Sequence, residues 1–150
     1  KIDFPFIKLS SRINNNMPNS SFSLIKEKIK NLKNKKILIM GLSYKEDIDD
    51  TRNSASIILY KKLIKKGSKI TFHDPLVNEK ENITHKEIPK FEKFDLIAFC
   101  VKHKDYKKIS LADFSRKPVY FDLNNVLEEK KINYMKRKNY KLFILGRYSE

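Results

Sequence analysis

The sequence predicts an α/β fold, a Rossmann-like three-layer sandwich around a mainly parallel sheet of about five or six strands. From residue 36 onward, short apolar runs alternate with segments of helical periodicity. The runs are apolar throughout rather than alternating with polar residues, which is typical of parallel strands covered by helices on both faces. A length of 150 residues with 40% hydrophobic residues suits one ordinary domain with a core of its own.

The segment before the first strand is predicted to be a lead-in followed by a helix. The expected helix breakers are Pro5, Pro18 and the asparagines 14–16. Ser20 and Ser21 can cap a helix, and the apolar spacing predicts that this helix covers 22–33. We therefore expect residues 1–33 to precede the domain proper, which spans 34–150. The start at a residue other than Met indicates a piece of a longer protein.

The elements of the domain follow from apolar periodicity and from turn residues. Expected strands cover residues 36–40, 69–73, 96–101, 118–122 and 141–145. Expected helices cover 53–66, 105–109 and 126–138, with Gly67 placed as a C-cap after the first. The polar segment 76–93 is ambiguous and has room for a short irregular helix.

The loop from Gly41 to Ser54 joins the first strand to the first helix of the domain. It contains a single glycine, so it cannot hold a pyrophosphate through bare backbone as a GxGxxG turn does. Lys45 offers a point charge and Arg52 a planar fork, and both side chains suit phosphate oxygens. The pattern predicts phosphate recognition by side chains.

Ordinary structural roles explain the same residues equally well. Lys45 could equally be an ordinary surface lysine that is solvated and binds no ligand. The segment Asp49–Arg52 can be a helix start with a local ion pair, in which Thr51 or Asn53 caps the helix. Both interpretations can hold together, with the aspartates orienting the basic groups.

Ligands of such sheets gather beyond the carboxyl ends of the strands. The polar residues expected there are the Gly41–Ser54 loop, His73–Pro75, Lys102–His103, Asp122–Asn125 and Gly146–Arg147. With only three histidines and no metal-ligand spacing, we expect no metal site, and His73 and His103 are expected to form structural hydrogen bonds. The single cysteine, Cys100, excludes an internal disulfide and is expected to be a buried structural thiol in a cytoplasmic protein.

The net charge of +15 invites a nucleic-acid-binding function. The basic residues are nearly all lysines spread over every expected helix and loop, which is typical of the coding bias of an AT-rich genome. We keep a basic nucleic-acid-binding module as the alternative function. No apolar stretch approaches the roughly 20 residues needed to span a bilayer, so no membrane partner is expected.

Several motifs, in order along the chain, resemble the C-terminal domain of the UDP-glucose/GDP-mannose dehydrogenase family. The matching segments are Ser11–Pro18, Gly41–Lys45, Asp49–Ser54, His73–Pro75, Val101–Tyr106 and Phe143–Arg147. The resemblance covers nearly all of residues 11–147. It implies that residues 1–33 are the end of a central dimerisation helix with a connecting helix, and that 34–150 bind a nucleotide sugar.

The resemblance implies an NAD-dependent dehydrogenase that oxidises the C6 hydroxyl of a UDP-sugar to a carboxylate, in polysaccharide precursor synthesis. NAD would be bound mainly by an upstream domain of the same protein, which would be a homodimer. The catalytic cysteine of the family also lies upstream, and Cys100 does not match its motif. We therefore expect no catalytic residue in this chain and no activity of this piece alone.

Four binding residues are carried over from the family's motifs. Tyr44 and Lys45 match positions that contact the nucleotide sugar, and Arg52 matches an arginine that reaches the cofactor across the domain cleft. Arg12 matches an arginine that reaches the nucleotide sugar of the partner subunit. A third possibility is that the domain serves mainly as a dimer scaffold, in which case Arg12 would not affect substrate affinity.

The chain departs from the family after the fourth expected strand. Asn124 stands where many members have an arginine, and we include it among the substrate-binding residues. Arg147 or a nearby lysine can compensate for the missing charge; otherwise pyrophosphate affinity is lower or the sugar differs. Uridine is favoured over guanosine, and glucose, an N-acetylhexosamine and mannose all remain open.

Overall fold

The computed structural model describes residues 5–77, 83–84 and 87–146, and its centre is a six-stranded sheet. The strands are β1 (Lys36–Met40), β2 (Lys69–His73), β3 (Ile83–Thr84), β4 (Leu96–Phe99), β5 (Val119–Asp122) and β6 (Leu142–Ile144). Their order is β3-β2-β1-β4-β5-β6, and each pairing between these strands is parallel. This confirms the predicted mainly parallel sheet.

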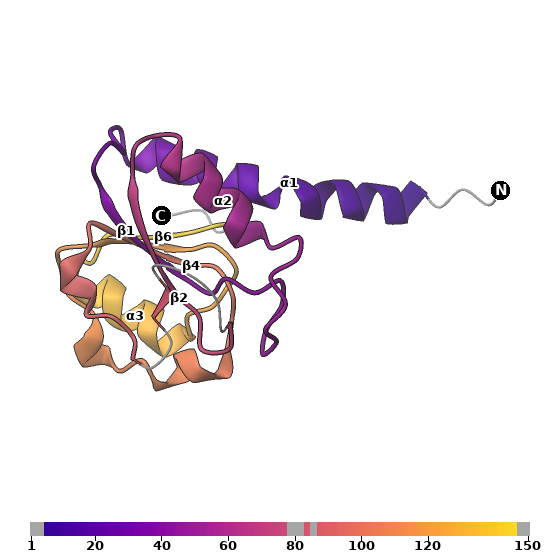
Figure 1. Cartoon of the computed structure of the whole chain (residues 1–150). Coiled ribbons are helices and arrows are strands. Elements are labelled where there is room, and N and C mark those ends of the chain that lie inside the picture. The colour runs from indigo at the N-terminus through magenta and orange to yellow at the C-terminus, as the bar shows by residue number, and fades with distance from the viewer. Residues whose placement is uncertain (1–4, 78–82, 85–86, 147–150) are drawn as a thin grey trace.

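Helices cover both faces of the sheet. They are α1 (Pro5–Lys28), α2 (Ala55–Ile64) and α3 (Glu129–Arg137), with three 3₁₀ turns, η1 (Phe91–Lys93), η2 (Lys104–Lys108) and η3 (Leu111–Asp113). The helices α1 and α2 lie together on one face, while α3 lies on the other (Figure 1). The three-layer α/β sandwich predicted from the sequence is confirmed.

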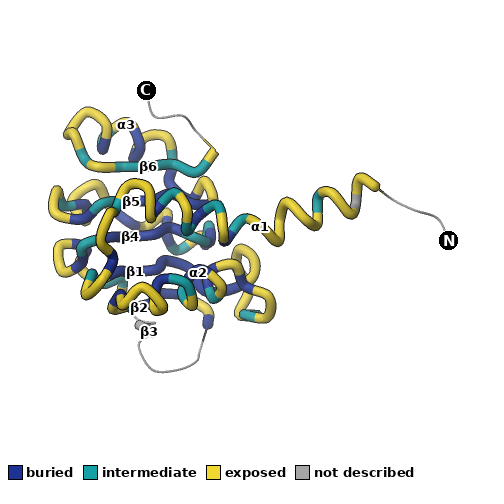
Figure 2. Tube along the Cα trace, turned by 90° about the horizontal axis from the view of Figure 1, so that it is seen from above, coloured by how far each residue is buried: buried dark blue, intermediate teal, exposed yellow. Residues whose placement is uncertain are grey.

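Two apolar clusters sit on the two faces of the sheet, and neighbouring strand residues alternate between them. In β1, Ile37 and Ile39 pack on the α1 and α2 side, whereas Leu38 and Met40 pack on the α3 side. All four side chains are fully buried, and the central strands form the buried interior (Figure 2). Because both faces are covered, the strand reads as a continuous apolar run.

The structure corrects the prediction for the N-terminal segment. The expected breakers do not interrupt it, and α1 runs from Pro5 to Lys28 with Pro18 inside. A proline inside a helix removes one backbone hydrogen bond and often kinks the helix, whereas burial of its apolar ring is favourable. Pro18 is buried, and the C-terminal half of α1 buries Ile25 against the sheet. Tertiary packing therefore overrides the local signals.

The N-terminal half of α1 projects away from the body of the domain (Figures 1 and 2). It carries three large apolar side chains at helical spacing, Phe6, Leu9 and Ile13, which are 80%, 53% and 55% exposed. The expected helix over 22–33 is therefore only the last part of a longer helix that ends earlier, at Lys28.

Other element boundaries differ by a few residues. The strands β1 and β2 match their predicted ranges, whereas β4 ends at Phe99 and the short helix predicted over 105–109 is the 3₁₀ turn η2. Helix α3 starts at Glu129 rather than at residue 126, because Asp122 accepts hydrogen bonds from the amides of Val126 and Leu127 and so forms a turn there. The two-residue strand β3 was not predicted.

Candidate functional site

The loop that follows β1 begins with a glycine that no other residue can replace without strain. Gly41 has a φ of 95°, in the left-handed region that favours glycine. A Cβ added at Gly41 would come 2.5 Å from the Cβ of Val101, just beyond the end of β4. The Gly41 amide donates to the carbonyl of His73 at the end of β2 (2.8 Å). This glycine thus serves close packing between strand ends rather than contact with a phosphate.

Asp74, the residue after β2, is the centre of a buried hydrogen-bond network. Its Oδ2 accepts from the backbone amides of Leu42 (2.6 Å) and Ser43 (3.0 Å). Its Oδ1 accepts from the amides of Leu76 (2.9 Å) and Val77 (3.1 Å) in its own turn. A fully buried carboxylate therefore accepts the hydrogen bonds of the backbone amides at the end of β1, where many dinucleotide-binding folds place a phosphate.

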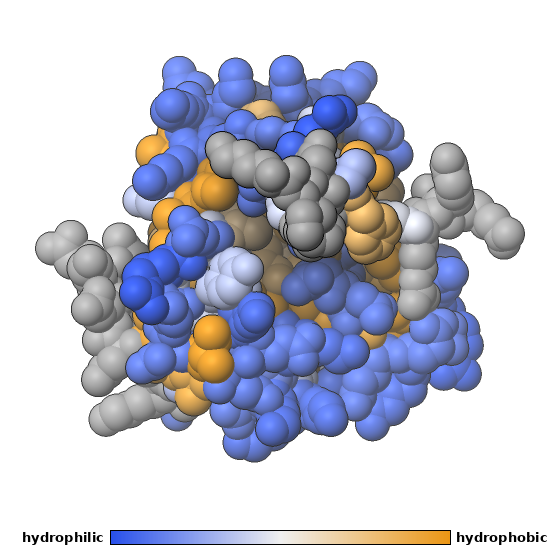
Figure 3. All heavy atoms as spheres, turned by 90° about the vertical axis from the view of Figure 1, so that its right-hand side faces the viewer, coloured by the Kyte–Doolittle hydropathy of each residue, from blue (hydrophilic) through white to orange (hydrophobic). Residues whose placement is uncertain are grey.

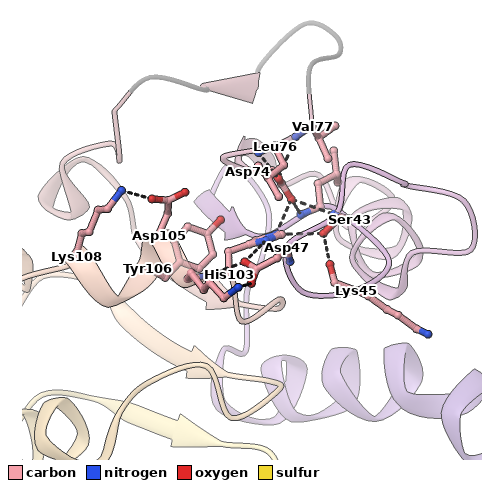
Figure 4. Close-up of polar contacts among 12 residues, drawn as sticks. Ser43, Lys45, Asp47, Asp74, Leu76, Val77, His103, Asp105, Tyr106 and Lys108 are labelled. Carbon is pink, nitrogen blue, oxygen red and sulfur yellow. Dashed lines mark hydrogen bonds and ion pairs between the residues drawn. The ribbon is translucent and has the colours of Figure 1, made fainter.

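His103 joins this network from the segment after β4. Its Nδ1 accepts from the Asp47 amide (3.1 Å), which places the ring proton on Nε2. The Nε2–H faces Asp74 Oδ2 and Ser43 Oγ, both at 3.1 Å, and the Ser43 hydroxyl donates to the Lys45 carbonyl (2.8 Å). Figure 4 shows these groups converging from three elements while the Lys45 side chain points away from them.

The network determines the charge state of its acids. Burial alone would raise the pKa of Asp74, but hydrogen bonds from His103 and from the amides of Leu42, Leu76 and Ser43 outweigh it and hold that pKa well below the usual range. Asp47 accepts from the Lys104 amide (2.9 Å), and this bond is the main reason why its pKa is also lowered. Both carboxylates are ionised at neutral pH.

The turn η2 is fixed behind His103 by two buried groups. The Tyr106 hydroxyl donates to the His73 carbonyl (2.8 Å), and burial raises its pKa well above the usual value. Lys131 of α3 is 3% exposed, and its Nζ donates to the carbonyls of Tyr106 and Lys107, both at 3.2 Å. Lys108 also pairs with Asp105 on the surface of this turn (Figure 4). His103 is therefore held from both sides.

The second half of the loop is organised differently. Arg52 forms a two-pronged ion pair with Asp50, with Nη2 2.8 Å from Oδ2 and Nε 3.0 Å from Oδ1, and its side chain is 87% exposed. The guanidinium hydrogen bond is the main cause that lowers the pKa of Asp50 to about 2. This confirms the predicted local ion pair. The helix cap is Ser54, whose side chain accepts from the Ser56 amide (3.2 Å), rather than Thr51 or Asn53.

A cavity opens between this loop, the start of α2 and the ends of β4 and β5. Its volume is about 450 Å³, and its lining is Ser43, Tyr44, Lys45, Glu46, Ala55, Ser56, Cys100, Val101 and Asn124. A second space of about 230 Å³ shares five of these residues and extends to Asn14, Met17 and Ser21 of α1. Figure 3 shows the side on which the loop lies, where hydrophilic residues surround a recess with hydrophobic residues deeper inside.

The structure brings three of the predicted site residues together and leaves two apart. Tyr44, Lys45 and Asn124 line the first cavity, and Asn124 Nδ2 donates to the Cys100 carbonyl (3.1 Å). Arg52 does not line either space, and Arg12 lies on the projecting half of α1, beside a separate surface groove. Arg147, the proposed substitute for the missing arginine, falls outside the described residues, as does His85.

Cys100 lines both spaces and is partly buried rather than fully buried as the sequence predicted. Burial is the main cause that raises its pKa to about 12, and the nearby Asp122 carboxylate adds to the effect. A thiol with that pKa carries almost no thiolate at neutral pH.

Sequence reasoning missed the organising role of Asp74 and His103. Both were noted as polar residues beyond strand ends, and His103 was expected to form structural hydrogen bonds, which the structure confirms. Their meeting point with Ser43 depends on the strand order, which the sequence pattern does not specify.

Among the described residues, no cluster of three or more acidic, histidine or cysteine side chains could hold a metal ion. None of the described helices has the length and apolar character required to cross a membrane.

Sequence comparisons with known proteins point to one family. The profile of the UDP-glucose/GDP-mannose dehydrogenase family, UDP binding domain, matches residues 38–129. The chain is 28% identical to the UDP-glucose 6-dehydrogenase of Rickettsia typhi over 159 residues, covering 97% of this chain and 36% of that protein. It is 33% identical to the UDP-N-acetyl-D-glucosamine 6-dehydrogenase of Salmonella typhi over 138 residues, covering 83% and 32%.

A solved structure shares the fold over nearly the whole chain. The NDP-N-acetyl-D-galactosaminuronic acid dehydrogenase from Methanosarcina mazei Go1 superposes with a TM-score of 0.74 at 22% identity, covering 98% of this chain and 34% of that one. The chain spans about a third of the length of the curated relatives described above.

Proposed function

The chain belongs to the UDP-glucose/GDP-mannose dehydrogenase family, and on that premise we propose that it is the nucleotide-sugar-binding domain of an NAD-dependent dehydrogenase. The complete enzyme would work in the cytoplasm, oxidising the C6 hydroxyl of a UDP-sugar to a carboxylate for polysaccharide precursors. The observation that carries this proposal is the 450 Å³ cavity at the carboxyl edge of the sheet, lined by Tyr44, Lys45 and Asn124. Uridine is favoured because both curated relatives described above are named for UDP-sugars.

Lys45 is the proposed ligand of the diphosphate. Of the described residues that line the two connected spaces, it is the only basic one. Its Nζ lies 5.4 Å from the centre of the Tyr44 ring, and Tyr44 is 52% exposed. An ammonium group beside an open aromatic face offers a nucleotide both charge and a stacking surface.

The proposed NAD site lies mainly outside this chain, and the geometry of the loop supports that division. The amides of Leu42 and Ser43 are occupied by the Asp74 carboxylate, so these two amides at the start of the loop after β1 are not available to a dinucleotide pyrophosphate. The Arg52 side chain is paired with Asp50 but is 87% exposed, and it can contact a cofactor held by another domain. The NAD, when bound, would accept the hydride.

Matched alanine variants of the full-length enzyme test these two roles. We expect Lys45→Ala to raise the KM for UDP-glucose about tenfold or more, because a hydrogen bond to a charged group contributes about 1.5–3 kcal/mol. Arg52→Ala should instead raise the KM for NAD. Lys136→Ala, on α3, is the control for loss of one exposed lysine. Unchanged Michaelis constants for both substrates in both variants would refute the site assignment.

A gain of affinity tests the role of Asn124. Asn124→Arg restores the arginine that many family members carry, and we expect it to tighten UDP binding because it adds a second cation to the cavity. Calorimetric titration with UDP measures the effect. Looser binding would place the diphosphate elsewhere.

Random oligonucleotides, titrated at several salt concentrations, test the alternative function, since a nucleic-acid-binding module would bind them with a steep salt dependence.

Arg12 is proposed to serve the site of a partner subunit in a homodimer. It lies outside the two connected spaces of its own chain, on the half of α1 that projects from the domain. Mixing Arg12→Ala subunits with Lys45→Ala subunits tests this, because each hybrid dimer would contain one site with both residues intact. We expect activity to return on mixing. No recovery would mean that Arg12 acts within its own chain or only as part of a scaffold.

A further inference from the structure

The Tyr44–Lys45–Glu46 segment is exposed, yet a buried network fixes it on both sides. Residues 44 to 49 are all exposed, so none of them belongs to the apolar core. Fixing the backbone of one residue costs about 1–2 kcal/mol of conformational entropy. A fold gains little by ordering such a segment, whereas a binding site gains affinity when its ligand groups are held in place beforehand.

His103 bridges the two residues that flank Lys45 at equal distance along the chain. Its Nε2 side faces Ser43 Oγ, and its Nδ1 accepts from the Asp47 amide, both at 3.1 Å. The Lys45 carbonyl is held by the Ser43 hydroxyl. One imidazole ring therefore closes the loop beneath Lys45.

Asp74 fixes the ring and the start of the loop together. Its Oδ2 accepts from His103 Nε2 and from the Ser43 amide, and both side chains are fully buried. Asp47, at the far end, has a φ of 56°, in the left-handed region that few non-glycine residues adopt and in which aspartate is among the more frequent ones. Its carboxylate accepts from the Lys104 amide, next to His103. The far end is thus tied to the same strand end as the ring.

We propose that His103 and Asp74 are positioning residues, which hold the loop so that Lys45 meets the diphosphate of the nucleotide sugar. The inference rests on the proposed function in one respect, namely that Lys45 binds this ligand. Neither residue touches the substrate. Both act on affinity through the backbone on either side of Lys45.

A double-mutant cycle in the full-length enzyme tests the proposal, with UDP as the probe and calorimetry as the measurement. We expect Lys45→Ala and His103→Phe each to weaken UDP binding about tenfold or more. The double variant should bind no more weakly than Lys45→Ala alone, because residues that act through one another are not additive. A purely structural role predicts the opposite, a loss that persists unchanged when Lys45 is absent.

Two conservative variants show whether the hydrogen bonds carry the effect. His103→Gln keeps a donor near the Nε2 position, and His103→Asn keeps an acceptor near the Nδ1 position. Each should recover part of the affinity that His103→Phe loses, although phenylalanine better preserves the ring packing against Tyr106 (centroids 5.5 Å apart). These two variants decide the question alone if His103→Phe does not fold, which a thermal melt followed by circular dichroism reveals.

The outcomes separate this inference from the proposed function. If Lys45→Ala leaves UDP affinity unchanged, the site assignment and the inference fail together. If Lys45→Ala weakens binding while His103→Phe does not, or while the two losses add in full, only the inference is overturned. If His103→Gln and His103→Asn bind UDP as weakly as His103→Phe does, the inference is overturned as well. The KM for NAD is the internal control and should stay constant in all His103 variants.

Discussion

The two halves of the loop between β1 and α2 are held in opposite ways. Residues 41–47 are tied to β2 and β4 by the buried Asp74 and His103. Residues 48–53 carry a surface ion pair, Asp50 with Arg52, between positions two apart in the chain. Ion pairs in water contribute little to stability, whereas removing one partner of a buried charged network costs several kcal/mol. Burial, rather than the number of charged contacts, is therefore expected to decide which half contributes more to stability.

The largest effect is expected for Asp74→Ala, which removes the anchor of the first half. Four backbone amides and His103 lose an acceptor, and each buried unsatisfied group costs about 1–3 kcal/mol. We expect the free energy of unfolding to fall by about 3 kcal/mol or more, measured by urea denaturation. Asp50→Ala, in the second half, is the matched control and should leave the urea midpoint nearly unchanged. Equal losses in both variants would contradict the comparison.

A smaller loss is expected for Gly41→Ala at the start of the anchored half. The new methyl group would lie 2.5 Å from Val101 Cβ at a φ of 95°, so both overpacking and backbone strain apply. Together they should destabilise the protein by about 2–4 kcal/mol in urea denaturation. Gly67→Ala is the control for backbone strain without overpacking, because Gly67 also has a positive φ but an added Cβ would lie no closer than 3.4 Å to a neighbouring atom. This substitution should lower the free energy of unfolding by about 1 kcal/mol. A similar loss at Gly67 would show that packing against Val101 is unimportant.

The pH dependence of stability should change when Asp74 becomes neutral. Its pKa in the folded protein lies below the usual 3.8, so its ionised form stabilises the fold above that pH, and this contribution is lost as the pH falls toward the folded value. The stability difference between the wild type and Asp74→Asn should therefore shrink between about pH 5 and pH 2 in urea titrations. A difference that stays constant over this range would mean that the carboxylate contributes through shape rather than charge.

The smallest effect on stability is expected for Arg52→Ala. The pair with Asp50 is largely solvated, and salt screens such contacts. The urea midpoint should not change measurably at physiological salt. A clear drop would show that the second half of the loop is anchored after all, and the contrast between the two halves would disappear.

The sequence predicted the central strands well and the helix ends poorly. The apolar runs of β1 and β2 match their observed ranges because covering helices leave no polar face on either strand. Helix α1 continues through Pro18, and that proline is buried in the folded chain, which no local signal reports. The start of α3 likewise follows from the Asp122 turn rather than from apolar spacing.

Within the candidate site, the sequence singled out Lys45, Tyr44 and Asn124, and the structure lines one cavity with all three. Lys45 follows from its residue type and its position after a strand, whereas Tyr44 and Asn124 follow only from the resemblance to the family's motifs, and ligand binding by all three stays a prediction. The network of Asp74 and His103 could not be predicted in this way. Asp74 and His103 lie 29 residues apart in the sequence. They meet because β2 and β4 lie on either side of β1, so that the ends of these three strands are close together.

The sequence by itself determined the α/β class, the approximate positions of every described strand except β3, and the absence of a glycine-rich phosphate loop after β1, because these depend on local composition and periodicity. The tertiary structure alone decided what replaces that loop. The strand order places a carboxylate from the end of β2 on the amides after β1, a position at which many dinucleotide-binding folds hold a phosphate. A buried carboxylate accepts hydrogen bonds only from donors that the fold brings within hydrogen-bond distance. The order of the strands in the sheet, rather than the sequence of the loop, sets that distance.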